Sequence, residues 1–505
     1  MEIKRILYFG LLIASFFYGC TSTRMVQQKS SDMEPYRPKY HFTPKAHWMN
    51  DPNGMVYLNG KYHLFFQYNP DSTVWGPMHW AHATSKDMIH WEEQPIALYP
   101  DSLGTIFSGS AVIDKDNTAG FGKNAMVAIF THHNKKIEDQ KTGLHQYQSL
   151  AYSLDEGKTW TKYKGNPVLP NPGIWDFRDP KVMWHAATRK WIMTLATKDR
   201  ITFYSSPNLK KWSKESEFGE KLGAHGGVWE CPDLFPLELD GKTHWVLLVS
   251  INPGGPNGGS ATQYFTGDFD GKTFKPDAEK QKWMDYGTDN YAGVTFSNTG
   301  TRKVLMGWMN NWNYANVVPT GSWRGATTLP RDLTLKKVGQ EIYLASTPVN
   351  EVSKLEKVVF ERKELTGINS LDLSAGLKDG KGTKIEMQVN SPGDFSIELG
   401  DGKNQKLIIG FEQDKGYFID RSHAGNSSFE KDFAKKYSSP RISNVATKKV
   451  VIYIDAASVE LFADNGLTAM TEVFFPIQKN TLLQIKSPQK IDVPMVKVST
   501  IERIN

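Results

Sequence analysis

The chain has 505 residues, which is too long for one compact hydrophobic core, so we expect it to fold as two domains. Aromatic residues make up 12% of it, including 15 tryptophans, a content that suits a large β-sheet core or a carbohydrate site. The net charge of +6 is small for this length, and no dense basic stripe is present. Nucleic acid is therefore excluded as an expected partner.

The N-terminus has the form of an export signal. Two basic residues precede an apolar run, 6–18, that is too short to span a bilayer as a mature helix. The run ends at Gly19-Cys20, an arrangement that resembles a bacterial lipoprotein signal cleaved before Cys20 and acylated on its thiol. We therefore expect a signal peptide at 1–19, a flexible linker at 20–37, and a lipid-anchored protein exported to the periplasm or cell surface. Ordinary secretion with cleavage nearby is the alternative.

The spacing of the cysteine, histidine and acidic residues indicates whether the chain can form a disulfide or bind a metal. The 2 cysteines are Cys20 and Cys231, so acylation of Cys20 leaves no partner for an internal disulfide. The pair His132-His133 lacks a third ligand, and the segment 114–117 lacks the glycine and glutamate of a calcium loop. We expect no metal, no other cofactor and no obligate protein partner.

Internal repetition predicts the architecture of residues 38–345. Five apolar, strand-like runs recur with starts 53 to 65 residues apart, and helical periodicity is nearly absent. A polar turn closed by an aromatic residue follows most of them, as in 85–91, 153–160 and 205–212, and is interpreted as a hairpin. Four-stranded antiparallel units in series indicate a five-bladed β-propeller, and a pair of sandwiches with coincidental spacing is the alternative. The runs are Tyr62–Tyr68, Met126–His132, Trp191–Thr197, His244–Ser250 and Lys303–Met309.

The C-terminal part has a different pattern. After a predicted hinge at 346–355, alternating strands separated by Asp-Gly and Asn-Gly turns predict a β-sandwich over 356–505. The chain is therefore expected to be all-β throughout. No carboxylate of the sandwich stands in an aromatic setting, so we interpret this domain as a packing or binding module.

Three carboxylates of the propeller segment stand among aromatic residues and prolines: Asp51 in WMNDPNG, Asp179 in FRDP and Glu230 in WECPDLF. Each precedes an apolar run by 11 to 14 residues and so occupies one phase of the repeat. The second and fifth units have 107–110 and 289–291 at a related phase. If this phase is the innermost strand of each blade, all these side chains converge on the axial channel.

The setting of each carboxylate suggests a role in glycoside hydrolysis, which uses two carboxyl groups across the scissile bond. Asp51 is expected in a turn forced by 52–54, an open position that suits an ionised nucleophile. Glu230 has apolar neighbours in sequence, which disfavour a charged carboxyl group and suit a general acid. Arg178 beside Asp179 would keep that carboxylate ionised to bind ring hydroxyls. Taken singly, each is also explained as a surface turn, a core residue or a local ion pair.

The order of WMNDPNG, FSGSAV, FRDP, WECPDLF and LPRDL resembles glycoside hydrolase family 32, the β-fructosidases that include invertase, inulinase and levanase. The late segment VELFADNG resembles the sandwich signature of that family, whereas Asp332 stands where the family more often has Glu. The resemblance implies retaining cleavage of β-D-fructofuranosidic bonds in levan, inulin or sucrose. It makes Asp51 the nucleophile, Asp179 the transition-state stabiliser and Glu230 the acid/base. The residues matched to the pocket for the terminal fructose are Asn50, Gln67, Trp75, Phe107, Ser108 and Arg178.

The mode of cleavage is expected to be exo-acting, with release of fructose. Segments 75–91 and 308–333 look most like bacterial levanases and exo-inulinases, and Trp75 is the expected wall of a closed pocket, with a core aromatic as the alternative. Trp312 is a candidate for a further surface on which sugar stacks, unless it is simply packed. An endo-acting levanase or inulinase, a fructosyltransferase and a non-catalytic fructan-binding lipoprotein are the competing functions.

Overall fold

The computed structural model describes residues 34–504. The predicted signal peptide and Cys20 lie outside these residues, as does nearly all of the predicted linker 20–37. Within the described part, no helix combines the length and the apolar character needed to cross a membrane. Its helical elements are the single turn α2 (Lys135–Glu138) and two 3₁₀ segments, η1 (Asn350–Leu355) and η2 (Ser374–Gly376).

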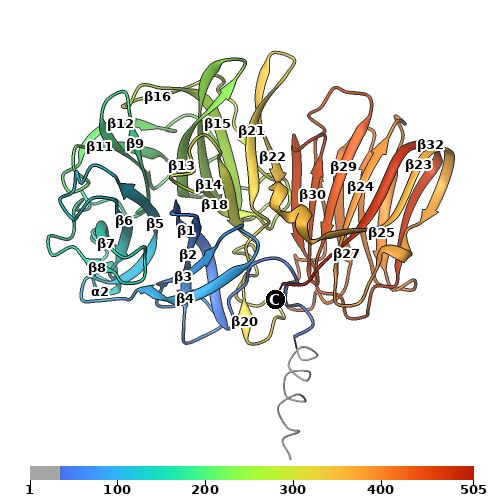
Figure 1. Ribbon diagram of the computed structural model, residues 1–505, viewed down its shortest axis with the longest axis horizontal. Helices are drawn as coiled ribbons and strands as arrows, with labels where there is room; N and C mark the ends of the chain where they lie inside the picture. The colour runs from blue at the N-terminus through green and yellow to red at the C-terminus, as the bar shows by residue number, and fades with distance from the viewer. Residues whose placement is uncertain (1–33, 505) are drawn as a thin grey trace, which may run out of the picture. The chain divides into compact units, whose positions relative to one another are not determined.

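Five antiparallel sheets follow one another along the chain from β1 to β22 (Figure 1). In each sheet the strands are hydrogen-bonded in chain order, and the first strands of neighbouring sheets contact one another in a closed ring. The prediction of a five-bladed β-propeller is therefore confirmed. The blades are β1 (His47–Leu58), β2 (Lys61–Asn69), β3 (His79–Ser85), β4 (Trp91–Leu98); β5 (Thr105–Asp114), β6 (Ala125–His133), β7 (Gln146–Ser153), β8 (Thr161–Lys162); β9 (Phe177–His185), β10 (Lys190–Thr197), β11 (Ile201–Ser206), β12 (Ser213–Phe218); β13 (Val228–Leu239), β14 (Lys242–Asn252), β15 (Ala261–Phe269), β16 (Phe274–Pro276), with β17 (Lys282–Trp283); and β18 (Tyr291–Thr295), β19 (Val304–Trp308), β21 (Arg331–Val338), β22 (Glu341–Pro348).

The repeats recognised in the sequence correspond to fixed places in the blade. The five apolar runs lie on the second strands, where blades pack face to face and both strand faces are buried. The predicted turns connect the third strand to the fourth in the first three blades. In each of them the closing tryptophan donates its indole N–H to the carbonyl three residues earlier: Trp91 to Met88 (2.9 Å), Trp160 to Gly157 (3.1 Å) and Trp212 to Leu209 (2.8 Å).

The last blade is joined to the first by a short parallel pairing. β20 (Trp323–Arg324), in the loop before β21, pairs with the start of β1. Val56 and Ser297 add a parallel bridge between the two blades. The ring is thus closed by contacts between its ends, and the inner strand of the first blade is held on both sides.

Two layers that share the long strand β32 (Leu482–Ile501) form the C-terminal sandwich, as predicted. The first part of β32 pairs with β25 and its last part with β24, while β23 (Glu356–Asp372) runs along its other edge. Apolar side chains of both layers form one core, which includes Ile385, Ile397 and Ile452. The remaining strands are β25 (Phe395–Gly400), β26 (Lys406–Glu412), β27 (Gly416–His423) and β28 (Lys436–Ser439) in one layer, and β24 (Gly382–Val389), β29 (Lys448–Ile454), β30 (Ser458–Ala463) and β31 (Thr468–Val473) in the other.

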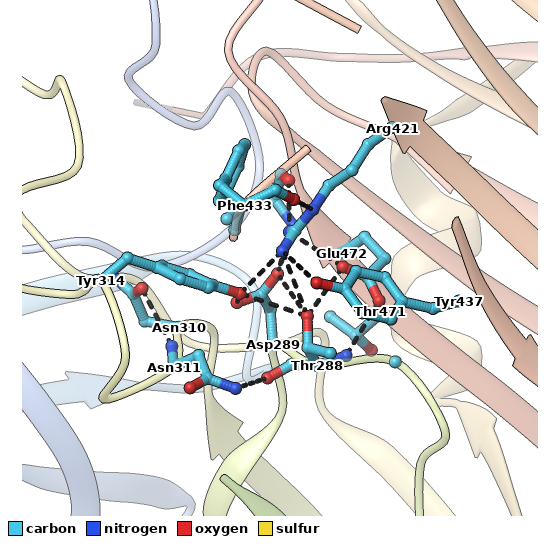
Figure 2. A network of polar contacts seen from close by, with 12 residues as sticks. Thr288, Asp289, Asn310, Asn311, Tyr314, Arg421, Phe433, Tyr437, Thr471 and Glu472 are labelled. Atoms are coloured by element: carbon cyan, nitrogen blue, oxygen red, sulfur yellow. Dashed lines mark hydrogen bonds and ion pairs between the residues drawn. The ribbon is translucent and has the colours of Figure 1, made fainter. Parts of the chain in front are cut away.

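Buried ion pairs connect the sandwich to the propeller (Figure 2). The guanidinium of Arg421, on β27, bonds Asp289 at 2.7 Å and Glu472 at 2.8 Å, and lies 3.8 Å from the centre of the Phe433 ring. Asp289 lies two residues before Tyr291, the first residue of the inner strand of the fifth blade, so this contact reaches the centre of the propeller. The Arg421 guanidinium that pairs with Glu472 also lies over the rings of Tyr314, Phe433 and Tyr437, so in the fold this sandwich carboxylate has aromatic rings close to its ion pair.

A second buried cluster joins two of the sequence motifs. Arg331 of LPRDL bonds Asp285 at 2.8 Å and Glu460 of VELFADNG at 2.5 Å. His41 bridges Glu460 and Asp455, each at 2.8 Å. These motifs therefore hold the two domains together, and the sandwich carboxylates act in packing. The strand β22 extends to Pro348, so the predicted hinge 346–355 begins inside it.

Candidate active site

Every inner strand of the propeller carries a β-bulge at the same height. In each, two residues oppose one residue of the second strand, which kinks the strand and redirects its side chains. The repeat explains why side chains from five blades converge on one mouth of the axial channel. The bulged pairs are Asn50-Asp51 opposite Gln67, Phe107-Ser108 opposite Thr131, Asp179-Pro180 opposite Leu195, Cys231-Pro232 opposite Val249, and Ala292-Gly293 opposite Gly307.

The segment WMNDPNG lies inside β1, and the predicted chain reversal at 52–54 is wrong. Pro52 and Gly54 are turn-forming residues, but here the chain continues to Leu58 through two bulges. Gly54 has φ +55°, and a Cβ there would lie 2.7 Å from the Trp80 ring. Asp51 is therefore held in a half-buried position by a bulged strand rather than displayed on a turn.

Asp51 and Asp179 are joined through a thiol. Ser108 Oγ donates to Asp51 Oδ2 at 2.8 Å. Cys231 Sγ lies 3.6 Å from Asp51 Oδ2 and 3.6 Å from Asp179 Oδ2, and its backbone N–H donates to the latter at 3.0 Å. Burial and the two carboxylates raise the pKa of Cys231 well above the usual value, so the thiol stays protonated and can donate. Carboxylates from two blades thus converge on one residue of a third.

Glu230 lies in a polar setting, contrary to the expectation from its sequence neighbours. Successive residues of a strand point to opposite faces, and Trp229 is buried between blades, where it donates to Ala224 O at 2.8 Å. Arg178 Nη2 donates to Glu230 Oε1 at 3.0 Å, and the hydroxyl of Tyr291 donates to Oε2. Arg178, expected to pair with Asp179, therefore makes its hydrogen bonds to Glu230 and to Asp176.

Burial and mutual repulsion alter the acidity of the two aspartates. Burial raises the pKa of Asp51, and the charge of Glu230 adds to this, against hydrogen bonds from Asn50 and Ser108. Burial raises the pKa of Asp179 to about 7, with Arg178 opposing and both Glu230 and Asp51 adding. The site therefore takes up protons more readily than separate carboxylates in water would.

The other predicted pocket residues lie around this centre. Asn50 accepts the indole N–H of Trp48 at 2.8 Å, and the amide nitrogen of Gln67, opposite the Asn50-Asp51 bulge, has no protein partner within residues 34–504. Phe107 stacks on His133 at 4.4 Å between ring centres. Trp75 is 44% exposed and meets the Phe107 ring edge-on, as a wall at the rim would.

Trp312 is largely packed against other aromatic rings. It stacks on Trp48 at 6.0 Å and meets Trp308 at 4.9 Å, and its backbone N–H donates to Ser260 Oγ at 3.2 Å. The ring therefore supports the β1 segment that carries Asn50 and Asp51. Trp312 contacts Trp48, whose indole N–H donates to Asn50, and in this way it supports the site. Its use as a surface on which sugar stacks remains a prediction.

Three residues of the site were not singled out from the sequence. Tyr291 was noted only as part of 289–291, although its position in the repeat was the signal that could have identified it. Cys231 was considered for disulfides alone, and Asp176, which fixes Arg178 at 2.5 Å, had no signal. Among residues 34–504, no group of three or more His, Cys, Asp or Glu side chains is placed to hold a metal ion.

Comparison with known proteins agrees with this geometry. The model of the glycosyl hydrolases family 32 N-terminal domain matches residues 41–348, and that of the family 32 C terminal matches residues 351–501. The chain belongs to glycosyl hydrolase family 32. This family 32 enzyme is thus a glycoside hydrolase, and the fold expected from the resemblance is the one found.

Relatives of this family 32 enzyme cover nearly the whole chain. A levanase from Bacillus subtilis (strain 168) is 47% identical over 470 residues, covering 90% of this chain and 68% of the relative. A levanbiose-producing levanase from the same strain is 37% identical over 463 residues, covering 89% and 87%. The crystal structure of exo-inulinase from Aspergillus awamori superposes with a TM-score of 0.85 at 37% identity, covering 94% of this chain and 99% of that one.

Proposed function

We propose that this protein is a retaining, exo-acting β-fructosidase that releases fructose from the ends of fructans such as levan and inulin, and also cleaves sucrose. The observation that carries the proposal is the convergence of three carboxylates from three blades: Asp51 and Asp179 share the thiol of Cys231, and Glu230, the residue before Cys231, takes the guanidinium of Arg178, the residue before Asp179. The relatives named levanase and exo-inulinase support fructan as the substrate class.

In the proposed mechanism Asp51 attacks the anomeric carbon and forms a fructosyl-enzyme intermediate. Ser108 and Cys231 orient the attacking carboxylate by donating hydrogen bonds to Oδ2. Glu230 protonates the departing oxygen and then removes a proton from the attacking water molecule.

Arg178 and Tyr291 hold the two oxygens of Glu230 in position for this transfer. Asp179 binds ring hydroxyls as positive charge develops on the sugar, and its backbone is fixed by Thr131 at 3.0 Å. No step requires a metal or other cofactor.

The proposal of the exo mode is supported by two aromatic residues at the rim of the site. Trp75 and Phe107 form one wall. The backbone N–H of Trp75 donates to Asn316 Oδ1 at 3.0 Å and so ties this wall to the fifth blade. The competing mode, release of longer products from a more open groove, is favoured by the relative that is named for producing levanbiose.

The experiment is chromatography of timed digests of levan, inulin and sucrose by the purified protein. Free fructose as the first product from both polymers is the expected result. Oligosaccharides or levanbiose as first products would overturn the exo assignment and leave the hydrolase. Transfer products at high sucrose concentration would instead identify a fructosyltransferase. Fructan binding without any cleavage would indicate the non-catalytic lipoprotein.

We further propose export and lipid anchoring at Cys20 to the cell envelope. The support is the signal-like sequence before Cys20, and relatives named extracellular exo-inulinase agree with export. Metabolic labelling with a palmitate analogue, compared between the wild-type protein and a Cys20→Ala variant, tests the anchor. Label that persists in the variant would contradict it.

A further inference from the structure

A second cavity opens at the other mouth of the propeller. Its volume is about 750 Å³, within the usual range for ligand pockets, and its lining comes from the later parts of the inner strands, such as Val182 on β9 and Leu234 on β13. The carboxylates of the active site stand earlier on the same strands. Asp179 and Trp184 are five residues apart on β9, or about 17 Å at the rise of an extended strand. The two sites are therefore distinct.

A buried ion pair forms a floor between the two mouths. Lys181 Nζ lies 3.1 Å from Asp233 Oδ2, and it donates to Thr295 O at 2.5 Å. The backbone N–H and hydroxyl of Thr295 donate to the same Asp233 oxygen at 2.6 and 2.7 Å. Asp233 is fully buried, yet its other oxygen, Oδ1, has no hydrogen-bond partner within residues 34–504. The floor is thus a closed, internally neutralised layer that separates the cavity from the active site.

Aromatic rings form the walls of this cavity. Trp184 is 38% exposed and rests edge-on against Trp191, with ring centres 5.1 Å apart. Trp191 is fixed by its indole N–H, which donates to Thr118 Oγ1 at 2.8 Å. Trp245 also lines the cavity and packs against Phe269. An exposed tryptophan held rigid by its neighbours is a platform for the apolar face of a ring.

The charges of the lining nearly cancel. Lys115, Lys181 and Lys303 stand among Asp114, Asp116, Asp233 and Glu238. Lys181 and Asp233 neutralise each other, and Asp114 accepts three hydrogen bonds from its own turn. A strongly charged ligand therefore has no matching counter-charge here. A neutral molecule with an apolar face fits the aromatic walls and the neutral floor.

We propose that this cavity is a non-catalytic binding site for fructan chains, with Trp184 as its stacking platform. The choice of fructan rests on the proposed function, whereas the preference for a neutral sugar rests on the cavity alone. A site whose platform stands about 17 Å along β9 from Asp179 holds a different part of a long polymer, or a second chain, and raises the concentration of chain ends near the active site. Sucrose, which is small, gains nothing from it.

The test is a titration of an Asp51→Ala variant, which does not consume the ligand, with an inulin-derived and a levan-derived fructo-oligosaccharide in a calorimeter. Two binding sites per chain are expected. Adding Trp184→Ala should leave one site, and adding Trp184→Phe, which keeps an aromatic ring, should leave two. One site in the Asp51→Ala protein, or two sites after Trp184→Ala, would overturn the proposal.

Rates give a second readout on the active protein. Trp184→Ala should lower the initial rate on dilute levan about threefold to tenfold through lost local concentration, while sucrose turnover and the unfolding temperature stay unchanged. Unchanged sucrose turnover also establishes that the variant is folded, whatever the exo or endo mode. An equal loss on sucrose would contradict the proposal. Binding of dextran but not fructan at this cavity would overturn the choice of sugar.

Discussion

Tyr291 and Glu230 are joined by a hydrogen bond from the phenol to Oε2, although they stand 61 residues apart on the inner strands of adjacent blades. The other Glu230 oxygen receives Arg178 from a third blade. The position of the acid/base candidate is thus set by two neighbouring blades, and a change in either should alter catalysis without changing the carboxylate itself.

Tyr291→Phe should lower kcat about tenfold, because it removes the hydroxyl that orients Glu230 and keeps the buried ring; a hydrogen bond to a charged group contributes about 1.5 to 3 kcal/mol. The measurement is kcat and KM on sucrose together with the unfolding temperature. Tyr343→Phe, on the outer strand β22, is the matched control and should behave as wild type. Equal kcat for both variants would show that the hydroxyl does not position Glu230.

Asp51→Ala and Glu230→Ala should each lose several orders of magnitude in turnover while folding normally, because general acid catalysis alone contributes about 10² to 10⁴. The two roles predict different rescue by azide. Glu230→Ala should regain activity on an activated fructoside and form a fructosyl azide with retained configuration, whereas Asp51→Ala should give the inverted product. Near wild-type release of reducing sugar by either variant would remove it from the catalytic pair.

Asp179→Asn should be inactive yet more stable than wild type at pH 8. Burial raises the pKa of Asp179 from 3.8 to about 7, so the folded state binds this proton more tightly than the unfolded chain does. That contribution is complete below the unfolded pKa and is lost as pH rises from about 4 through 7. Replacement by the neutral amide should recover on the order of 2 kcal/mol at pH 8.

Denaturant unfolding at pH 4, 6 and 8 measures this difference. The wild type should lose stability across the interval relative to Asp179→Asn, whose curve should be flatter. Asp71→Asn, at an exposed position, is the control and should follow the wild type. A parallel pH dependence for wild type and Asp179→Asn would mean that Asp179 is not protonated in the folded protein.

Arg421→Met should destabilise the protein by about 3 to 5 kcal/mol, because it leaves Asp289 buried without its partner. Burial raises the pKa of Glu472 to about 8, although the charge of Arg421 opposes this rise. Glu472→Gln, which replaces a protonated carboxyl group, should therefore lower the free energy of unfolding much less than Arg421→Met. Arg441→Met, which breaks a pair between a partly exposed arginine and the buried Asp464 within the sandwich alone, is the matched control. Guanidinium unfolding compares the three.

A single cooperative transition at lower denaturant is expected for Arg421→Met if the domains still unfold together. Because Asp289 lies two residues before Tyr291, sucrose turnover should fall as well. Stability and turnover equal to those of Arg441→Met would show that the network does not support the active site.

The repeat was readable from the sequence because the second strand of every blade is buried on both faces and appears as an apolar run. That run fixes the phase of the inner strand, and with it the convergence of Asp51, Asp179 and Glu230. The bulges were not readable in the same way. Pro52 and Gly54 serve turns and bulges equally well, and the pairing of β1 with β2 beyond Gly54 decides between them.

Contacts between residues far apart in the sequence could not be predicted from the residues that adjoin each of them in the sequence. Trp229 adjoins Glu230 in sequence but points to the opposite face, whereas Arg178 approaches it from another blade. The buried carboxylates of the sandwich are a second case, since Glu460 finds Arg331 129 residues away. Such pairs leave no spacing signal, and the domain interface became visible only in the fold.

A buried histidine pair should make the protein sensitive to acid. His63 Nδ1 and His82 Nε2 lie 3.0 Å apart in the first blade, and the His82 ring stacks on Phe65 at 4.3 Å. Burial lowers the pKa of His63 to about 4 and that of His82 to about 3, so both are neutral when folded. The unfolded chain binds these protons from about pH 6.5, and stability falls as pH drops from there towards 4.

His82→Gln should reduce this acid sensitivity, because the amide keeps a polar partner for His63 and cannot take up a proton in that range. The loss of unfolding free energy between pH 7 and pH 4.5 should shrink by on the order of 2 kcal/mol relative to wild type. His90→Gln, at an exposed position paired with Asp87, is the control and should leave the slope unchanged. Urea unfolding at several pH values measures this slope. If His82→Gln and His90→Gln follow the same curve, the His63–His82 pair is not the acid-sensitive element.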